Sequence, residues 1–208
     1  MRGRRKLNIK GIVQGVGFRP FVYRIAHDLQ LAGFVRNTTD GVEIEIEGES
    51  DRLGQFTEML SMERPAAARI DAILCEDAPC RGDDRFSIIE SRISAGFTQL
   101  SPDIATCADC LNEMRDREDR RHSFPFINCT NCGPRYSIIR DTPYDRPRTS
   151  MRAFKMCRDC SREFKDVTDR RFHAQPDCCK ICGPRFRLVA IKGKAIAGPD
   201  PIRQTAEL

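Results

Sequence analysis

The cysteines in the second half of this sequence are the residues most directly suited to chemistry. Eight of them form one pattern written twice: a CxxC pair, eighteen intervening residues and a second CxxC pair, repeated at an offset of fifty residues. The eight are Cys107, Cys110, Cys129, Cys132, Cys157, Cys160, Cys179 and Cys182. Two CxxC pairs supply the four thiolates of a tetrahedral structural zinc site, and this spacing is typical of such sites. The sequence therefore predicts two structural Zn²⁺ ions.

Two ways of sharing the cysteines satisfy this spacing. Each ion could take both pairs of one copy, or pairs could be exchanged between copies, and the sequence leaves this open. A secreted disulfide framework is the competing interpretation, but such frameworks do not require repeated CxxC pairs. The other cysteines, Cys75, Cys80 and Cys178, fall outside the repeat and are interpreted as passive thiols. His122 and His173 lie between cysteine pairs, but each predicted site already has four thiolates.

The two copies also agree outside the cysteines. Both end in Cys-Gly-Pro-Arg, at 132–135 and 182–185, and both contain Asp-Arg-Arg, at 119–121 and 169–171. Glu113 and Glu163 coincide at the same offset. These matches indicate an internal duplication. The segments between cysteine pairs are charged and poor in large aliphatic residues, so bound metal is expected to supply much of their folding free energy.

A second candidate for chemistry is a glycine-rich loop near the N-terminus, which we call the cradle loop. Its residues, the predicted phosphate-binding set, are Gln14, Gly15, Val16, Gly17, Phe18 and Arg19. Glycines let the backbone turn tightly and direct successive N–H groups at one point, and a helix N-terminus adds positive potential. Arg19, expected in the first helical turn, adds a fork of donors matched to phosphate or carboxylate oxygens. The alternative interpretation is a tight turn with a solvated arginine.

The elements that must position this loop follow from hydrophobic periodicity. Alternation of apolar and polar residues at 7–13, 42–47 and 70–74 predicts strands. Helical spacing at 21–29 and 53–60 predicts two helices, with Ser50 as the N-cap of the second. Short apolar runs at 32–36 and 86–89 predict two further strands. The order is β-α-β-β-α-β with a trailing strand, which is an α+β, ferredoxin-like arrangement.

Charge argues against a nucleic-acid partner. The net charge is +5, but residues 1–95 carry 14 Lys+Arg against 15 Asp+Glu, and residues 96–208 carry 21 against 15. Eight thiolates around two Zn²⁺ would add a charge of about −4, which leaves the cysteine-rich half near +2 and weakens the attraction for phosphate backbones. The sequence contains no signal peptide and no apolar run long enough to cross a membrane. A cytoplasmic location is therefore expected.

Composition divides the chain into four parts. They are an N-terminal domain at 1–91, a linker at 92–106, a tandem zinc-finger module at 107–187 with copies at 107–135 and 157–185, and a tail at 188–208. The tail is expected to begin a further domain, with a helix from about Pro201.

Two segments of the N-terminal domain closely resemble the signatures of the acylphosphatase family. They are residues 11–19, GIVQGVGFR, and residues 33–41, GFVRNTTDG. The family has the β-α-β-β-α-β fold already expected from periodicity. The resemblance implies that Arg19 binds the substrate phosphate and that Asn37 orients the attacking water. Charge stabilisation and water positioning are sufficient chemistry for an already activated mixed anhydride.

An acylphosphatase domain followed by two zinc repeats resembles the [NiFe]-hydrogenase maturation carbamoyltransferases, the HypF family. The Cys-Gly-Pro-Arg endings and the sequence FHAQP at 172–176 strengthen this resemblance, which covers essentially the whole chain. It implies carbamoyl phosphate as substrate, activation of the carbamoyl group with ATP, and transfer to a cysteine of a maturation partner protein. Family members continue for several hundred residues beyond this region. The chain is therefore expected to hydrolyse carbamoyl phosphate but not to carry out transfer.

Two other functions remain open at this stage. One is a free-standing acylphosphatase with a zinc appendage. The other is a zinc-ribbon module that binds nucleic acid or protein and carries an inactive enzyme domain. Strong, salt-dependent nucleic-acid binding would favour the last, and the charge distribution argues against it.

Overall fold

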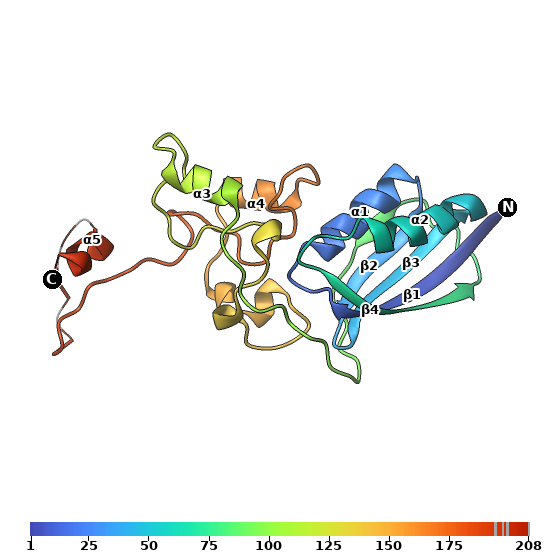
Figure 1. Cartoon of the computed structure of the whole chain (residues 1–208), viewed down its shortest axis with the longest axis horizontal. Helices are drawn as coiled ribbons and strands as arrows, with labels where there is room; N and C mark the ends of the chain where they lie inside the picture. The colour runs from blue at the N-terminus through green and yellow to red at the C-terminus, as the bar shows by residue number, and fades with distance from the viewer. Residues whose placement is uncertain (194, 197, 199, 208) are drawn as a thin grey trace.

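The computed structural model describes residues 1–193, 195–196, 198 and 200–207. Two bodies lie side by side along the long axis (Figure 1). They are the N-terminal domain and the cysteine-rich region at 107–187, called the cysteine module from here on. An extended tail then leads to a short helix, α5, at Pro201–Ala206. The start of α5 agrees with the helix expected from about Pro201. Leu208 and three other positions of the expected tail, 194, 197 and 199, lie outside the described residues.

The N-terminal domain is a five-stranded sheet with two helices on one face. Its strands are β1 (Arg2–Ile12), β2 (Ala32–Thr38), β3 (Gly41–Glu49), β4 (Arg69–Ala78) and β5 (Phe86–Ile88). The helices are α1 (Phe18–Asp28) and α2 (Ser50–Met62). The strand order is β4-β1-β3-β2-β5, with β5 parallel to β2 and the other pairs antiparallel. This confirms the predicted β-α-β-β-α-β order with a trailing strand.

Alternation in the strands explains why the sheet buries one face under the helices. Leu7 pairs with Ile44 and Ile9 with Val42 in the register of β1 and β3, and all four side chains are buried in the core. Helix α1 lies against β2 and β5, and α2 against β1 and β3. One detail of the prediction was wrong. Helix α2 begins at Ser50 instead of being capped by it, and the Ser50 hydroxyl donates to the Met1 carbonyl at 2.6 Å.

The polar residues of β3 are buried as well, which alternation alone does not predict. Glu43, Glu45 and Glu47 are at most 5% exposed. Arg4 of β1, itself buried, donates to Glu45 at 2.6 Å and to Glu47 at 2.8 Å. Glu43 pairs with Arg36 at 2.8 Å. The second face of the sheet is therefore held by arginine–carboxylate pairs instead of facing water.

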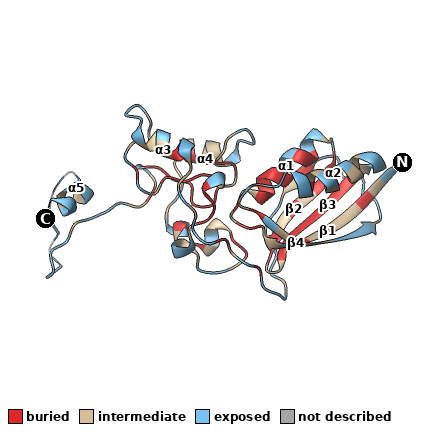
Figure 2. Ribbon diagram, viewed as in Figure 1, coloured by how far each residue is buried: buried red, intermediate tan, exposed pale blue. Residues whose placement is uncertain are grey.

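The cysteine module has little regular structure and its own small core. Its α-helices are α3 (Ala108–Arg115) and α4 (Arg158–Lys165), each beginning directly after the first cysteine of a copy. Short 3₁₀ helices occupy Thr130–Cys132, Tyr136–Ile138, Arg146–Arg148 and Ser150–Ala153. Figure 2 shows buried residues following the loops of the module, apart from those of the N-terminal domain. The core cluster of the module shares no residue with that of the N-terminal domain.

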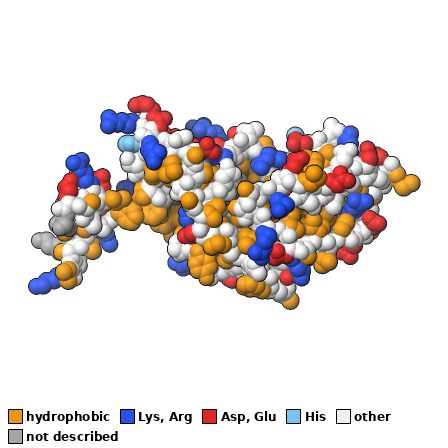
Figure 3. Space-filling model, viewed as in Figure 1, with side chains coloured by type: hydrophobic (Ala, Val, Ile, Leu, Met, Phe, Trp, Pro, Cys, Tyr) orange, Lys and Arg blue, Asp and Glu red, His pale blue; other side chains and the backbone are white. Residues whose placement is uncertain are grey.

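The segments expected as linker and tail are mostly irregular. Between 92 and 106 the structure has no helix and no strand, although Arg92 bridges Thr38 and Thr98 is buried. The domain bounds proposed from composition stay predictions. Figure 3 shows positive and negative side chains interspersed on the visible face. Among the described residues, no helix has both the length and the apolar character needed to cross a bilayer.

Candidate functional site

The cradle loop joins β1 to α1 through two glycines in left-handed conformation. Gly15 has φ 74° and Gly17, the N-cap of α1, has φ 75°, values that favour glycine. Helix α1 begins at Phe18, so Arg19 lies in its first turn, as expected. The side chains of Val16 and Phe18 are buried in the core, so any contact they make with a ligand must come from their backbone.

Arg19 and Asn37, which the family resemblance singled out, meet at one oxygen atom. Arg19 is 8% exposed and Asn37, on β2, is fully buried. The Nδ2 of Asn37 donates to the carbonyl oxygen of Tyr144 at 3.1 Å, and Nη2 of Arg19 donates to the same oxygen at 3.4 Å. The Oδ1 of Asn37 is buried and has no hydrogen-bond partner among the described residues. The two donors therefore converge on a single acceptor, and one acceptor atom beside them is unused.

The side chain of Gln14 makes its hydrogen bonds within the protein. Its Nε2 donates to the carbonyls of Thr38 and Gly41 at 2.7 and 2.8 Å. Its Oε1 accepts from the N–H of Tyr144 at 2.7 Å. These three bonds leave the side-chain amide little capacity for a phosphate. Gln14 instead ties the cradle loop to the hairpin that carries Asn37 and to the cysteine module.

The cysteine module covers the cradle loop. Tyr144 and Asp145 belong to the segment 136–156 between the two copies, called the connecting segment from here on. The carboxylate of Asp145 pairs with Nη2 of Arg19 at 2.8 Å. A Cβ on Gly15 would lie 2.8 Å from Pro134, and one on Gly17 would lie 3.2 Å from Thr130. The remaining cavity is about 20 Å³, which has room for about one water molecule but not for a phosphate group.

The role of the connecting segment was missed in the sequence. Tyr144 lies 125 residues from Arg19 and 107 from Asn37, and it belongs to no cysteine motif. The only available signal was compositional. The connecting segment contains Ile138, Ile139, Tyr144, Met151 and Phe154. These apolar residues suggest burial but do not identify what the segment covers.

The eight repeat cysteines lie in two groups, each made of one copy. Within each group the sulfur atoms all lie within 4.8 Å of one another. Measured pairs include Cys107–Cys129 at 3.6 Å, Cys157–Cys179 at 3.8 Å and Cys179–Cys182 at 3.9 Å. A tetrahedral zinc ion bound to four sulfurs at about 2.3 Å requires a separation of about 3.8 Å between them. The donor set and its spacing therefore fit zinc, and they favour ligands shared within a copy over exchange between copies.

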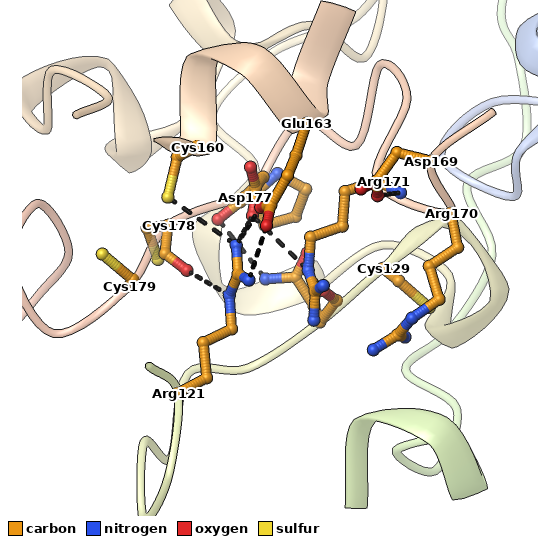
Figure 4. Close-up of polar contacts among 12 residues, drawn as sticks. Arg121, Cys129, Cys160, Glu163, Asp169, Arg170, Arg171, Asp177, Cys178 and Cys179 are labelled. Atoms are coloured by element: carbon orange, nitrogen blue, oxygen red, sulfur yellow. Dashed lines mark hydrogen bonds and ion pairs between the residues drawn. The ribbon is translucent and has the colours of Figure 1, made fainter. Parts of the chain in front are cut away.

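Exchange between the copies occurs one layer further out, through arginines. Figure 4 shows one of them, Arg121 of the first copy, which reaches Cys160 and Glu163 of the second copy. Arg120 of the first copy donates to Cys160 Sγ of the second at 3.3 Å, and Arg170 of the second donates to Cys110 Sγ of the first at 3.0 Å. Arg120 and Arg170 also pair with Glu163 and Glu113, respectively. These residues coincide at the fifty-residue offset, so the contacts are reciprocal. Each predicted metal site thus receives a positive charge from the other copy, which offsets the excess negative charge of four thiolates.

The next arginine of each copy continues this exchange. Arg121 donates to Glu163 at 2.6 Å and to the Cys178 carbonyl at 3.0 Å, and Arg171 donates to Glu113 and to the Asn128 carbonyl at 3.1 Å. Asp177 breaks the symmetry, because the corresponding residue of the first copy is Ile127.

Asp177 is fully buried and lies 2.8 Å from Arg121 and 3.7 Å from Arg171. Burial raises its pKa to about 6 despite these two cations. Asp177 therefore depends on its arginine partners for its charge.

Thiols and imidazoles outside the repeat stay outside both groups. Cys178 is buried, and burial raises the pKa of its thiol to about 12, whereas Cys75 and Cys80 are exposed. His122 and His173 are absent from the described metal-ligand groups. Burial and the nearby Arg19 cation lower the pKa of His173 to about 4. These side chains have no evident part in metal binding.

Comparison with known proteins identifies both bodies. Residues 5–88 match the acylphosphatase family, and residues 106–139 and 156–189 each match the HypF finger. Carbamoyltransferase HypF2 of Cupriavidus necator is 47% identical over 154 residues, which are 73% of this chain and 19% of that protein. An acylphosphatase of Synechococcus sp. is 44% identical over 89 residues, 42% of this chain and 98% of that protein.

A solved structure agrees over the full length. The crystal structure of full-length HypF in its phosphate- and nucleotide-bound form superposes with a TM-score of 0.92 at 45% identity, covering 100% of this chain and 27% of that one. The chain spans about a fifth of the length of the curated HypF relatives it matches. The acylphosphatase match supports acylphosphatase-type hydrolase activity. Through its acylphosphatase domain and its two HypF fingers, this chain belongs to the HypF carbamoyltransferase family.

Proposed function

We propose that the cradle loop and Asn37 form a hydrolytic site for an acyl phosphate, with carbamoyl phosphate as the substrate. The observation that carries this proposal is the convergence of Arg19 Nη2 and Asn37 Nδ2 on the carbonyl oxygen of Tyr144. Donors that share one acceptor oxygen can also hold a phosphate and a water molecule in contact with each other. The match of residues 5–88 to acylphosphatases supports this class of reaction.

The roles follow from the chemistry of the two side chains. Arg19 neutralises the phosphate with a fork of charged donors. Asn37 orients water, because its buried Oδ1 is free to accept a water O–H and its Nδ2 is a donor on the same group. The water oxygen replaces the acyl oxygen on phosphorus, the anhydride bond breaks, and the proton passes to a phosphate oxygen. The products from carbamoyl phosphate are carbamate and inorganic phosphate.

The metal of the two cysteine groups is proposed to be Zn²⁺ with a structural role. Four thiolates at zinc-like spacing support this, because a closed four-cysteine site keeps no open position for a substrate. Bound zinc would supply folding free energy to a module whose own apolar core is small. Arg120 and Arg170 would hold the thiolates of the opposite copy in place.

The wider reaction is also a proposal. The relatives are named carbamoyltransferases, and this chain covers 19% of their length. We place the chain in the part of that reaction that breaks down carbamoyl phosphate, in the service of hydrogenase maturation and its protein acceptor. The contribution argued from these residues is the hydrolysis itself.

Phosphate release from carbamoyl phosphate by the purified chain tests the proposal. Arg19→Ala should lower kcat/KM by about 100- to 1000-fold, the usual effect of removing a preorganised catalytic donor. Asn37→Ala should lower mainly kcat, because water is oriented during the reaction and not while substrate binds.

Arg24→Ala is the matched control, because it removes an exposed arginine from the same helix. It should leave turnover unchanged. Asn37 is buried, so the melting temperature of each variant must be measured alongside its rate. Wild-type rates in folded Arg19→Ala and Asn37→Ala would contradict the assigned site.

A further inference from the structure

Two acceptor groups of the cysteine module occupy the donors of the acyl phosphate site. The carbonyl of Tyr144 takes hydrogen bonds from Arg19 and Asn37, and the carboxylate of Asp145 pairs with Arg19 at 2.8 Å. The Arg19 side chain is 9% exposed and that of Asp145 is 21% exposed. A carboxylate here has the sign and the hydrogen-bonding geometry of a phosphate oxygen pair. The cysteine module thus presents an anion to the residue expected to bind the substrate's anion.

We propose that Asp145 sets the affinity of the acyl phosphate site for phosphate, because its carboxylate competes with phosphate for Arg19. The inference rests on the proposed function of Arg19. A phosphate group can accept hydrogen bonds from all the Arg19 donors only when the Asp145 carboxylate no longer pairs with Arg19. If the Asp145 carboxylate stayed in place beside a bound phosphate, the two negative charges would repel each other in a partly buried site, where screening by water is weak. Asp145 therefore lowers the affinity of the site for any phosphate-bearing ligand.

Asp145 is not needed to hold the module against the cradle loop. Gln14 binds the N–H of Tyr144 at 2.7 Å, and Pro134 packs where Gly15 has no Cβ. These contacts are neutral and lie beside the ion pair. These two contacts can thus persist when a ligand anion displaces the Asp145 carboxylate, but the cavity of about 20 Å³ must enlarge by the movement of that side chain before it can admit a phosphate group.

An open groove leads to the ion pair from solvent. Arg19 and Asp145 both line it, and its volume is about 610 Å³. Arg146, Arg148 and Lys165 line the same groove together with Glu90, so cationic side chains outnumber carboxylates there and favour the approach of anions. A ligand entering this way meets Asp145 before it can occupy the cradle loop. The arrangement draws anions in but binds them weakly, which would keep the product, inorganic phosphate, from blocking the site.

Binding of inorganic phosphate to the full chain tests the proposal directly. Asp145→Asn removes the charge and keeps the shape, and it should bind phosphate about tenfold more tightly, a change of about 1.4 kcal/mol. Asp145→Glu keeps a competing carboxylate and should bind phosphate as the wild type does. The KM for carbamoyl phosphate should fall in Asp145→Asn with the phosphate dissociation constant. An unchanged or weaker phosphate affinity in Asp145→Asn would overturn the proposal.

Two further variants separate direct competition from a general effect of charge. Asp141→Asn removes the same charge from the connecting segment, at a carboxylate that pairs with Arg148 and is 65% exposed. It should change phosphate affinity by less than about twofold, as expected for an exposed pair. In an Arg19→Ala background, Asp145→Asn should no longer tighten phosphate binding, because the shared donor is gone. A tenfold gain that persisted there would also overturn the proposal.

The two proposals fail in different ways. A wild-type chain that hydrolyses no acyl phosphate contradicts the proposed function. Phosphate binding still decides the role of Asp145 in that case, since the measurement needs no turnover. Hydrolysis with equal phosphate affinity in wild type and Asp145→Asn contradicts only the competition.

Discussion

Replacing Arg121 with methionine should weaken metal retention at both cysteine groups. Arg121 is 1% exposed and donates to Glu163 at 2.6 Å, to Asp177 at 2.8 Å and to the carbonyl of Cys178 at 3.0 Å. Methionine keeps most of the apolar stem but removes the guanidinium. Asp177 is then left fully buried, with Arg171 at 3.7 Å as its remaining cation among the described residues.

The magnitude follows from the burial of the partners. Removing one member of a buried ion pair typically costs about 3–5 kcal/mol. Arg120 still pairs with Glu163, so the lower end, about 3 kcal/mol, is expected. Because metal binding and folding of the module are coupled, this loss corresponds to about a hundredfold weaker apparent zinc affinity.

Competition with a chromophoric chelator measures this loss, with zinc release followed together with unfolding of the module. Arg121 belongs to the first copy and its partners to the second, so both ions should be lost in one transition. Arg117→Met, at an exposed arginine of the same copy, should behave as wild type. The double variant Arg121→Met, Asp177→Asn should recover part of the zinc affinity, since it no longer buries an Asp177 carboxylate without its Arg121 partner. Release from the second copy alone, or unchanged affinity in Arg121→Met, would refute the reciprocal coupling of the two copies.

Elemental analysis of protein purified without added metal should approach two zinc ions per chain, since each cysteine group offers four thiolates. Strong chelation should unfold the cysteine module and leave the cooperative transition of the N-terminal domain in place, because the two cores share no residue; loss of both transitions would contradict this. Gly15→Ala should destabilise the chain by about 1 kcal/mol or more, because φ is 74° and a Cβ would meet Pro134, and hydrogen exchange should rise around Tyr144. The pKa of His173 is about 4 in the folded chain against 6.5 for the free side chain, so folding favours the neutral imidazole. The free energy of unfolding of the wild type, relative to that of His173→Asn, should therefore be highest above pH 6.5 and should fall as the pH drops from 6.5 to 4. A difference in denaturation midpoints that does not vary with pH would argue against that burial.

The sequence alone was sufficient to predict those elements whose pattern lies within a short stretch of neighbouring residues. Strand and helix periods repeat within a few residues, so β1, β3 and both helices of the N-terminal domain could be predicted. Their ends were less accurate, since β1 begins at Arg2 and α1 at Phe18, before the alternation at 7–13 and the helical spacing at 21–29 that predicted them. A CxxC pair is a chelate formed by neighbouring residues, so the cysteine groups were also predictable, apart from how the pairs are shared between copies. The family signatures pointed to Arg19 and Asn37 without any structure.

The tertiary structure decided the contacts between distant segments. Arg120 and Arg170 were visible as a matched pair of positions, but the sequence gives no indication that each reaches the opposite copy, because that depends on how the copies pack. The burial of Glu43, Glu45 and Glu47 depends on arginines of other strands and of the loops. Tyr144 and Asp145 reach the proposed acyl phosphate site from more than a hundred residues away. The contacts of Tyr144 and Asp145 are fixed by the docking of two folded bodies, and docking leaves no periodicity in the chain.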